Sequence, residues 1–96
     1  MSESQFDRVT VYRAHPDISF TRFGDEGLLV VPRQAWQIVL NGVGARAFEL
    51  LDGRRSLGQI AELLADEYDV APEQALADVR ELLADLAAKG AIEKQA

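Results

Sequence analysis

Short runs of apolar and β-branched residues in the first half of the chain predict three β-strands. The first is Ile18–Phe23, and the second is Leu28–Val31, which ends at Pro32, a residue that cannot donate to a sheet ladder. The third, Trp36–Leu40, alternates along its length and places every second side chain on the same face. Gly24–Gly27 suits a tight connector, since glycine readily adopts the positive φ that hairpins need. These segments predict an antiparallel meander.

Helical spacing of apolar residues begins near the middle of the chain. Asn41 is a suitable N-cap for a first helix within Gly42–Leu51, and the Asp-Gly pair that follows provides a stop. Ser56 and Gln59 then match a capping box, in which each side chain satisfies a backbone amide beside the other. The apolar stripe of the amphipathic second helix that follows consists of Leu57, Ile60, Leu64 and Tyr68.

A third helix begins at Pro72, where a missing amide is harmless, and ends before Gly90. Its apolar stripe consists of Leu76, Val79, Leu83 and Leu86. Val9–Tyr12 is either a short strand or an extended lead-in, and we expect a flexible tail over residues 1–8 ahead of a single domain over residues 9–93. The sequence thus predicts an α+β domain, winged helix-turn-helix-like, with a three-stranded antiparallel sheet followed by three helices.

The residue inventory leaves little room for catalysis or metal binding. The chain of 96 residues has no cysteine and one histidine, His15, which with Asp17 supplies at most two ligands of a metal site. Because His15 precedes a proline, it is more typical of a turn. Ser56 has the position of a helix cap, and no motif places a histidine near it. We therefore expect a protein that is not an enzyme, with no catalytic residue, no metal and no cofactor.

The apolar segments are short. None approaches the roughly 18 residues that a membrane span needs, and the first residues lack the layout of a secretory signal. We therefore expect a cytoplasmic protein with no membrane partner.

Charge is distributed unevenly along the chain. Between Ser56 and Lys89 there are eight acidic and two basic residues, so this segment carries the whole net charge of −6 and the rest is neutral. Such a run is typical of a solvated helix face, and it also suits a surface for a basic partner. A winged helix that binds nucleic acid needs Lys and Arg on its docking helix. The charge therefore argues against a nucleic-acid partner.

The order and spacing of several segments resemble the PqqD-like family. This family includes the peptide chaperone of pyrroloquinoline quinone biosynthesis and the wider group of RiPP precursor peptide recognition elements. The resemblance covers residues 16–92, and its most telling combination is Leu40-Asn41 followed about ten residues later by Leu50–Arg54. The other matching segments are Leu28–Pro32, Ile38-Val39, Gly44-Ala45, Arg55-Ser56, Ile60, Leu64, Asp78-Val79, Leu82-Leu83, Leu86 and Lys89-Gly90.

The resemblance implies a non-catalytic peptide chaperone. Such a domain binds the leader of a ribosomally made precursor peptide and presents it to a modifying enzyme, such as a radical SAM protein. The leader would add as a further strand beside the third strand and lie against the third helix, which is β-augmentation. The implied peptide-binding residues are Gln34, Ala35, Trp36, Gln37, Ile38, Val39 and Leu40 of the edge, and Leu76, Val79, Arg80 and Leu83 of the helical wall.

The residues leave alternatives open at this point. Leu40, Val79 and Leu83 are expected to serve the core first, because apolar stripes at this spacing usually bury. Trp36 suits a core cap as well as it suits a ligand anchor. The alternative function is a winged-helix DNA-binding transcriptional regulator. A third possibility is a module that scaffolds an enzyme without binding a leader.

Overall fold

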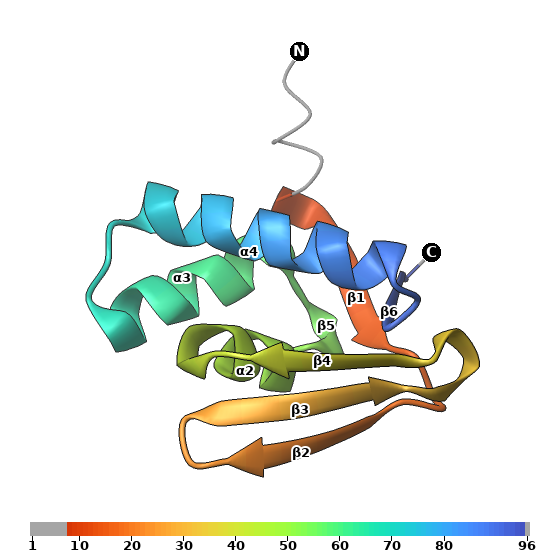
Figure 1. The fold of residues 1–96 in the computed structure, drawn as a ribbon. Helices are drawn as coiled ribbons and strands as arrows, with labels where there is room; N and C mark the ends of the chain where they lie inside the picture. The colour runs from red at the N-terminus through yellow and green to blue at the C-terminus, as the bar shows by residue number, and fades with distance from the viewer. Residues whose placement is uncertain (1–7, 96) are drawn as a thin grey trace.

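A computed structural model describes residues 8–95, whose strands form two antiparallel three-stranded sheets joined by helices (Figure 1). The strands are β1 (Val11–Ala14), β2 (Ser19–Phe23), β3 (Glu26–Val31), β4 (Trp36–Leu40), β5 (Asp52–Ser56) and β6 (Ile92–Lys94). The helices are the 3₁₀ turn η1 (Pro32–Gln34) and the α-helices α2 (Gly42–Glu49), α3 (Leu57–Tyr68) and α4 (Pro72–Ala88). The predicted α+β class is confirmed.

The first sheet is the predicted meander, in the order β2-β3-β4. Phe23 pairs with Glu26 across a two-residue turn in which Gly24 has a φ of 56°, a conformation that favours glycine. Burial alternates along β3, where Leu29 and Val31 are fully buried. This alternation gives the sheet an inner face, which is packed against helices, and an outer face.

A second sheet, in the order β5-β1-β6, corrects the prediction of a single sheet. The segment expected only to stop the first helix is strand β5, with Gly53 at a φ of 77°, and it pairs with β1 through Val11↔Ser56 and Arg13↔Asp52. Its sequence, Asp-Gly-Arg-Arg-Ser, has no alternating apolar residues, because backbone pairing rather than side-chain burial defines it. The predicted order of three strands followed by three helices is therefore incomplete.

The helix boundaries follow the predicted capping residues. The Asn41 side chain accepts a hydrogen bond of 2.8 Å from the amide of Gly44, which fixes the start of α2 directly after β4. Both hydrogen bonds of the capping box between Ser56 and Gln59 are present at the start of α3. Pro72 occupies the first turn of α4, as predicted.

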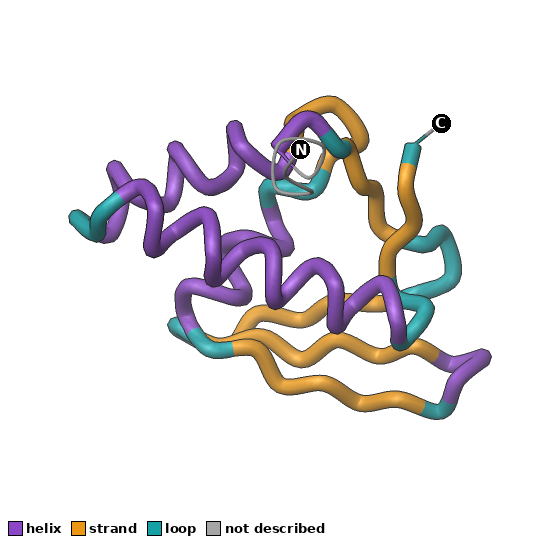
Figure 2. Tube along the Cα trace, turned by 90° about the horizontal axis from the view of Figure 1, so that it is seen from above, coloured by secondary structure: helices purple, strands orange, loops and turns teal. Residues whose placement is uncertain are grey.

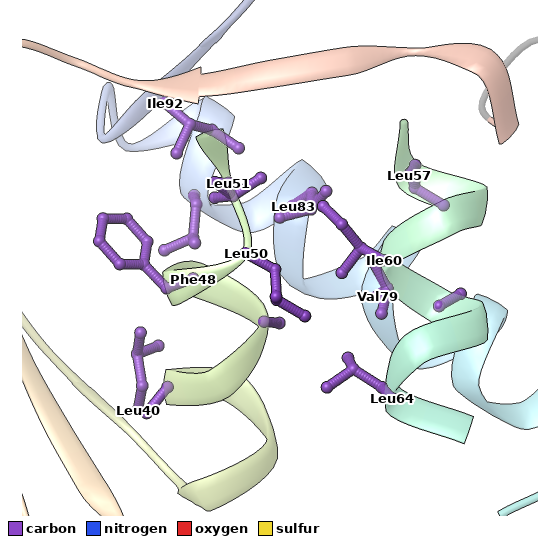
Figure 3. Close-up of a cluster of buried hydrophobic side chains, with 14 of the residues drawn as sticks. Leu40, Phe48, Leu50, Leu51, Leu57, Ile60, Leu64, Val79, Leu83 and Ile92 are labelled. Carbon is purple, nitrogen blue, oxygen red and sulfur yellow. The ribbon is translucent and has the colours of Figure 1, made fainter. Parts of the chain in front are cut away.

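One hydrophobic core joins the inner face of the β2-β3-β4 sheet to the three α-helices (Figure 3). Phe20 of β2 meets Phe48 of α2 with ring centroids 4.8 Å apart. In Figure 2 the helices lie on one side of this sheet, while its other side is bare. Among residues 8–95, none of the helices has the length and apolar character needed to cross a membrane. The tail predicted for residues 1–8 lies, except for Arg8, outside the described residues.

Candidate functional site

Strand β4 forms one edge of the larger sheet. It pairs with β3 on one side, and in the described part of the chain no strand pairs with its other side. Ile38 and Leu40 stand opposite Leu29 and Gly27 and so share the inner face, whereas Val39 lies on the outer face with 68% of its surface exposed. The backbone groups on this side of β4 therefore have no strand partner within residues 8–95.

Helix α4 runs alongside the open edge of β4, in the opposite direction (Figure 1). At one end, Lys89 Nζ lies 5.2 Å from the centroid of the Trp36 ring. At the other end, a cavity joins Asn41, which directly follows β4, to Asp78 and Leu82 of α4. The helical rise from Asp78 to Lys89 and the extended run from Trp36 to Asn41 both span about 16 Å, so helix and strand match in length.

The flank of α4 beside β4 is formed by Asp78, Leu82, Asp85 and Lys89, which recur at helical spacing. This position differs from the predicted helical wall. Leu76 is two residues from Asp78, and Arg80 is two residues from Leu82, which on a helix is about 200° around the axis. The structure therefore places Leu76 and Arg80 away from the flank that adjoins β4.

Two adjoining hollows lie along this flank of α4. The larger, of about 380 Å³, lies where β4 passes into α2, and it is bounded by α2, α3 and α4. The smaller is lined by Asp78, Glu81, Leu82 and Asp85, and it shares Asp78 and Leu82 with the larger. The residues lining the larger hollow are Asn41, Val43, Gly44, Ala47, Leu64, Tyr68, Val70, Ala75, Asp78, Val79 and Leu82. We call the two hollows together the groove; α2, α3 and α4 provide most of its lining, and Asn41, which directly follows β4, connects it to the edge strand.

Polar contacts between α2 and α3 hold the walls of the larger hollow. The Arg46 guanidinium donates two hydrogen bonds of 2.9 Å to the carboxylate of Glu67. These bonds lower the pKa of Glu67 and raise the pKa of Arg46. The Tyr68 hydroxyl donates a hydrogen bond of 3.3 Å to the carbonyl oxygen of Gly42. The hollow is thus bounded by elements that are cross-linked to one another.

The charge of the flank is mostly uncompensated. Asp85 forms an ion pair of 3.0 Å with Lys89. Asp78 accepts a hydrogen bond from the Gln74 side chain, but within residues 8–95 no lysine or arginine pairs with Asp78 or Glu81. The groove therefore combines apolar walls with two exposed carboxylates.

The remaining predicted site residues fall into two groups. Gln34 and Ala35 precede β4, where Ala35 has a left-handed φ of 57° and its amide donates to the Pro32 carbonyl oxygen. Trp36 is 44% exposed at the start of the edge, and Gln37 is also exposed. The second group belongs to the core, and it consists of Leu40, Val79 and Leu83, which are at most 4% exposed. Only the backbone of Leu40 is thus placed at the edge.

Sequence reasoning missed the polar residues of the groove. Asp78, Leu82, Asp85 and Lys89 have spacings of four, three and four residues, so their common face was readable. The apolar stripe of α4 is the stronger pattern and predicted the wall, whereas Val79, Leu83 and Leu86 of that stripe are buried. Tyr68 ends α3 and Val70 lies in the connection to α4, so both are far from β4 in sequence and no local pattern connects them to it.

His15 and Asp17 belong to a surface ion-pair cluster. His15 Nδ1 lies 2.6 Å from an Asp17 carboxylate oxygen, and Arg33 Nε donates to the other oxygen at 2.8 Å. Arg33 also contacts the His15 ring. Desolvation tends to raise the pKa of the Asp17 carboxyl. The hydrogen bonds and charges of Arg33 and His15 outweigh it, so the pKa of Asp17 is lowered. The cluster ties the turn before β2 to η1, which leads into β4.

An open strand edge flanked by a helix and an apolar groove is typical of domains that bind an extended peptide by strand addition. The family of coenzyme PQQ synthesis protein D (PqqD) matches residues 26–92, a range that contains β4, both hollows and α4. The chain belongs to the PqqD family.

Two curated relatives match this chain over most of their own length, and a third matches it over a small part. The PqqA binding protein of Xanthomonas oryzae pv. oryzae is 34% identical over 89 residues, which cover 93% of this chain and 95% of that protein. The PqqA binding protein of Gluconobacter oxydans is 34% identical over 71 residues, or 74% of this chain and 72% of that protein. The bifunctional coenzyme PQQ synthesis protein C/D of Methylorubrum extorquens is 31% identical over 77 residues, but the chain spans only 20% of its length.

Solved structures share the fold over most of their length. TbiB1 in complex with the TbiA(beta) leader peptide has a TM-score of 0.78 at 25% identity, covering 88% of this chain and 98% of that one. Lasso peptide synthetase B1, complexed with the leader peptide, has a TM-score of 0.74 at 26% identity, covering 85% and 96%. The PqqD truncation of Methylobacterium extorquens PqqCD, a stand-alone RiPP recognition element, has a TM-score of 0.73 at 28% identity, covering 86% and 88%.

Proposed function

We propose that this protein is a non-catalytic chaperone that binds the leader of a ribosomally made precursor peptide as a strand beside β4. The observation that carries the proposal is the unpaired edge of β4 flanked by α4. Two solved relatives of the same fold are complexes with leader peptides, and two sequence relatives are PqqA binding proteins. A cytoplasmic site of action fits a substrate that is made on ribosomes.

The β4 edge suits a guest strand better than the opposite edge of the same sheet. β2 is also unpaired on its outer side within residues 8–95, but neither hollow contains a residue of β2. Beside β4, a guest strand would exchange backbone hydrogen bonds on one side and place alternate side chains against α4. Main-chain bonds would provide affinity, and the groove would provide selectivity.

The proposed site keeps the predicted edge and revises the wall. Gln34 to Leu40 would contribute mainly through the backbone, with Trp36 and Ile38 turned toward the helical side. The flank of Asp78, Leu82, Asp85 and Lys89 replaces Leu76 and Arg80 as the helical wall. Val79 lines the larger hollow from beneath, whereas Leu83 supports α4 from the core.

We further propose that the bound leader is presented to a modifying enzyme, of which a radical SAM protein is one candidate. A leader that is disordered when free loses entropy on binding, so modest affinity is expected unless the enzyme reinforces it. The domain would supply recognition, and the enzyme would supply the chemistry. No reacting group of this chain is required for that division of labour.

Hydrogen exchange followed by NMR tests the proposal directly. The full chain is titrated with a PqqA peptide and with the TbiA(beta) leader, and amide protection is compared with that of the free protein. A strand added to β4 should slow exchange at alternate residues between Trp36 and Leu40, because only every second amide points outward. Unchanged exchange at the outward-facing amides of β4 at saturating peptide, or failure of both peptides to bind, would count against the proposal. Retention of duplex DNA at physiological salt would favour the winged-helix regulator instead.

A further inference from the structure

We propose that the recognised leader segment carries a large apolar side chain and a basic side chain two residues apart, which occupy the two hollows beside α4. This inference rests on the proposed function, because it assigns a chemical class to the peptide held at β4. Its basis is the form and charge of the groove along Asp78, Leu82 and Glu81.

The larger hollow is suited to an apolar side chain. It lies just beyond Leu40, where a strand paired with β4 would continue past the edge. Val43, Tyr68 and Val70 are partly exposed at this hollow, so an apolar guest would remove their surfaces from water together with its own. A volume of about 380 Å³ leaves ample room for one large side chain.

The smaller hollow is suited to lysine or arginine. Asp78 and Glu81 lie on either side of Leu82 and have no basic partner within residues 8–95, whereas Asp85 is already paired with Lys89. A long basic side chain could lay its aliphatic stem over Leu82 and reach these two carboxylates with its charged end. An acidic residue at the same place would face two like charges.

The spacing of the two hollows sets the spacing of the two guest residues. On α4, residues from Ala75 to Leu82 line the larger hollow and residues from Asp78 to Asp85 line the smaller, so the smaller is displaced by three residues, or about 4.5 Å along the axis. In an extended strand, residues i and i+2 are the nearest neighbours on the same side and are about 6.6 Å apart. This pair is the closest match to the displacement, so the groove favours an apolar and a basic residue separated by one residue that faces outward.

Selection from a random peptide library tests this inference. The full 96-residue chain is used to select displayed 12-residue peptides, and selected sequences are resynthesised for NMR. We expect enrichment of a large apolar residue with Lys or Arg two positions away. Replacing the apolar residue by Ala should weaken binding about tenfold and abolish the methyl shifts of Val43, Val70 and Leu82. Peptides that protect β4 but show no enrichment of basic residues would overturn the inference and leave the proposed function intact. Selected peptides that bind elsewhere would contradict both.

A matched pair of variants tests the charge. Asp78→Asn combined with Glu81→Gln should weaken the selected peptides about fivefold and reduce the salt dependence of binding. Glu62→Gln combined with Asp66→Asn removes the same charge from exposed positions of α3, outside both hollows, and should change affinity by less than twofold. Equal losses in the two double variants would show a general effect of net charge and would overturn the assignment of these carboxylates.

Discussion

Lys89 Nζ lies 5.2 Å from the centroid of the Trp36 ring, which connects the last turn of α4 to the first residue of β4. The ring is on the inner side of the sheet, yet it is 44% exposed. Trp36 therefore lies at one end of the groove, with one part covered by the helix and the other part open. This position allows Trp36 to cap the core and also to anchor a ligand, the two roles that the sequence left open.

The first prediction uses Trp36 as a reporter, since it is the only tryptophan of the chain. A guest strand beside β4 should cover part of the exposed ring, shift its fluorescence emission to shorter wavelength and reduce its quenching by acrylamide. The measurement is a titration with a PqqA peptide or the TbiA(beta) leader. A scrambled peptide serves as the control. Unchanged emission at a peptide concentration that saturates the NMR shifts would mean that the strand does not reach the start of β4.

The second prediction compares two leucines of α4 that are both partly buried. Leu82→Ala should weaken leader binding by about five- to twentyfold, because Leu82 lines both hollows and would lose roughly 1–2 kcal/mol of apolar burial on binding. Leu76→Ala removes the same atoms from the other flank and should leave affinity within twofold. Isothermal titration calorimetry measures both. The opposite ranking would restore the helical wall predicted from the sequence.

Local signals predicted most of the elements of this fold. Asn41, Ser56 and Pro72 have side chains that satisfy or avoid specific backbone hydrogen bonds at helix starts, so each position was readable from a few neighbouring residues. β5 was missed because its pairing with β1 joins residues about 40 positions apart and leaves no apolar alternation in its own sequence. Backbone pairing between residues far apart in the sequence is therefore the feature of the fold that the local sequence pattern did not predict.

The candidate site was predicted only in part, for a different physical reason. The edge strand was readable from its alternation, and Trp36 was placed correctly at its start. The predicted wall followed the strongest apolar stripe of α4, but that stripe faces the core, and Leu83 has no exposed surface. The flank beside that stripe contains mixed residues, such as Asp78 and Leu82, and no local pattern shows which neighbour they face.

The third prediction separates the core role of Leu83 from a binding role. Leu83→Ala should lower the free energy of unfolding by about 2–5 kcal/mol, since it leaves a cavity at a fully buried position. Chemical denaturation measures this loss. Leader affinity, measured where the variant is still folded, should change by less than threefold because the side chain does not reach the groove surface. A large loss of affinity in the folded variant would instead show that α4 shifts when its core contact is removed.

The fourth prediction concerns the ion pair that joins α2 to α3. Hydrogen bonds from Arg46 lower the pKa of Glu67 in the folded protein below its ordinary value of 4.5. A carboxyl group with a depressed folded pKa contributes its stability above the unfolded pKa and loses that stability as the pH falls through the folded pKa. The free energy of unfolding should therefore fall as the pH is lowered from about 5 through the acidic range. Glu67→Gln should show a shallower fall.

The difference in slope between the wild-type protein and Glu67→Gln measures the contribution of the ion pair between Arg46 and Glu67. The comparison is needed because other carboxylates also affect the pH dependence. The pKa values of Asp17 and Asp52 are lowered too, so some pH dependence should persist in Glu67→Gln. Glu62→Gln, an exposed substitution on the same helix, is the matched control and should keep the full slope of the wild-type protein. Denaturation at pH 6 and at pH 3 gives the comparison. If Glu67→Gln and Glu62→Gln lose stability equally on acidification, the contact between Arg46 and Glu67 does not stabilise the wall of the larger hollow.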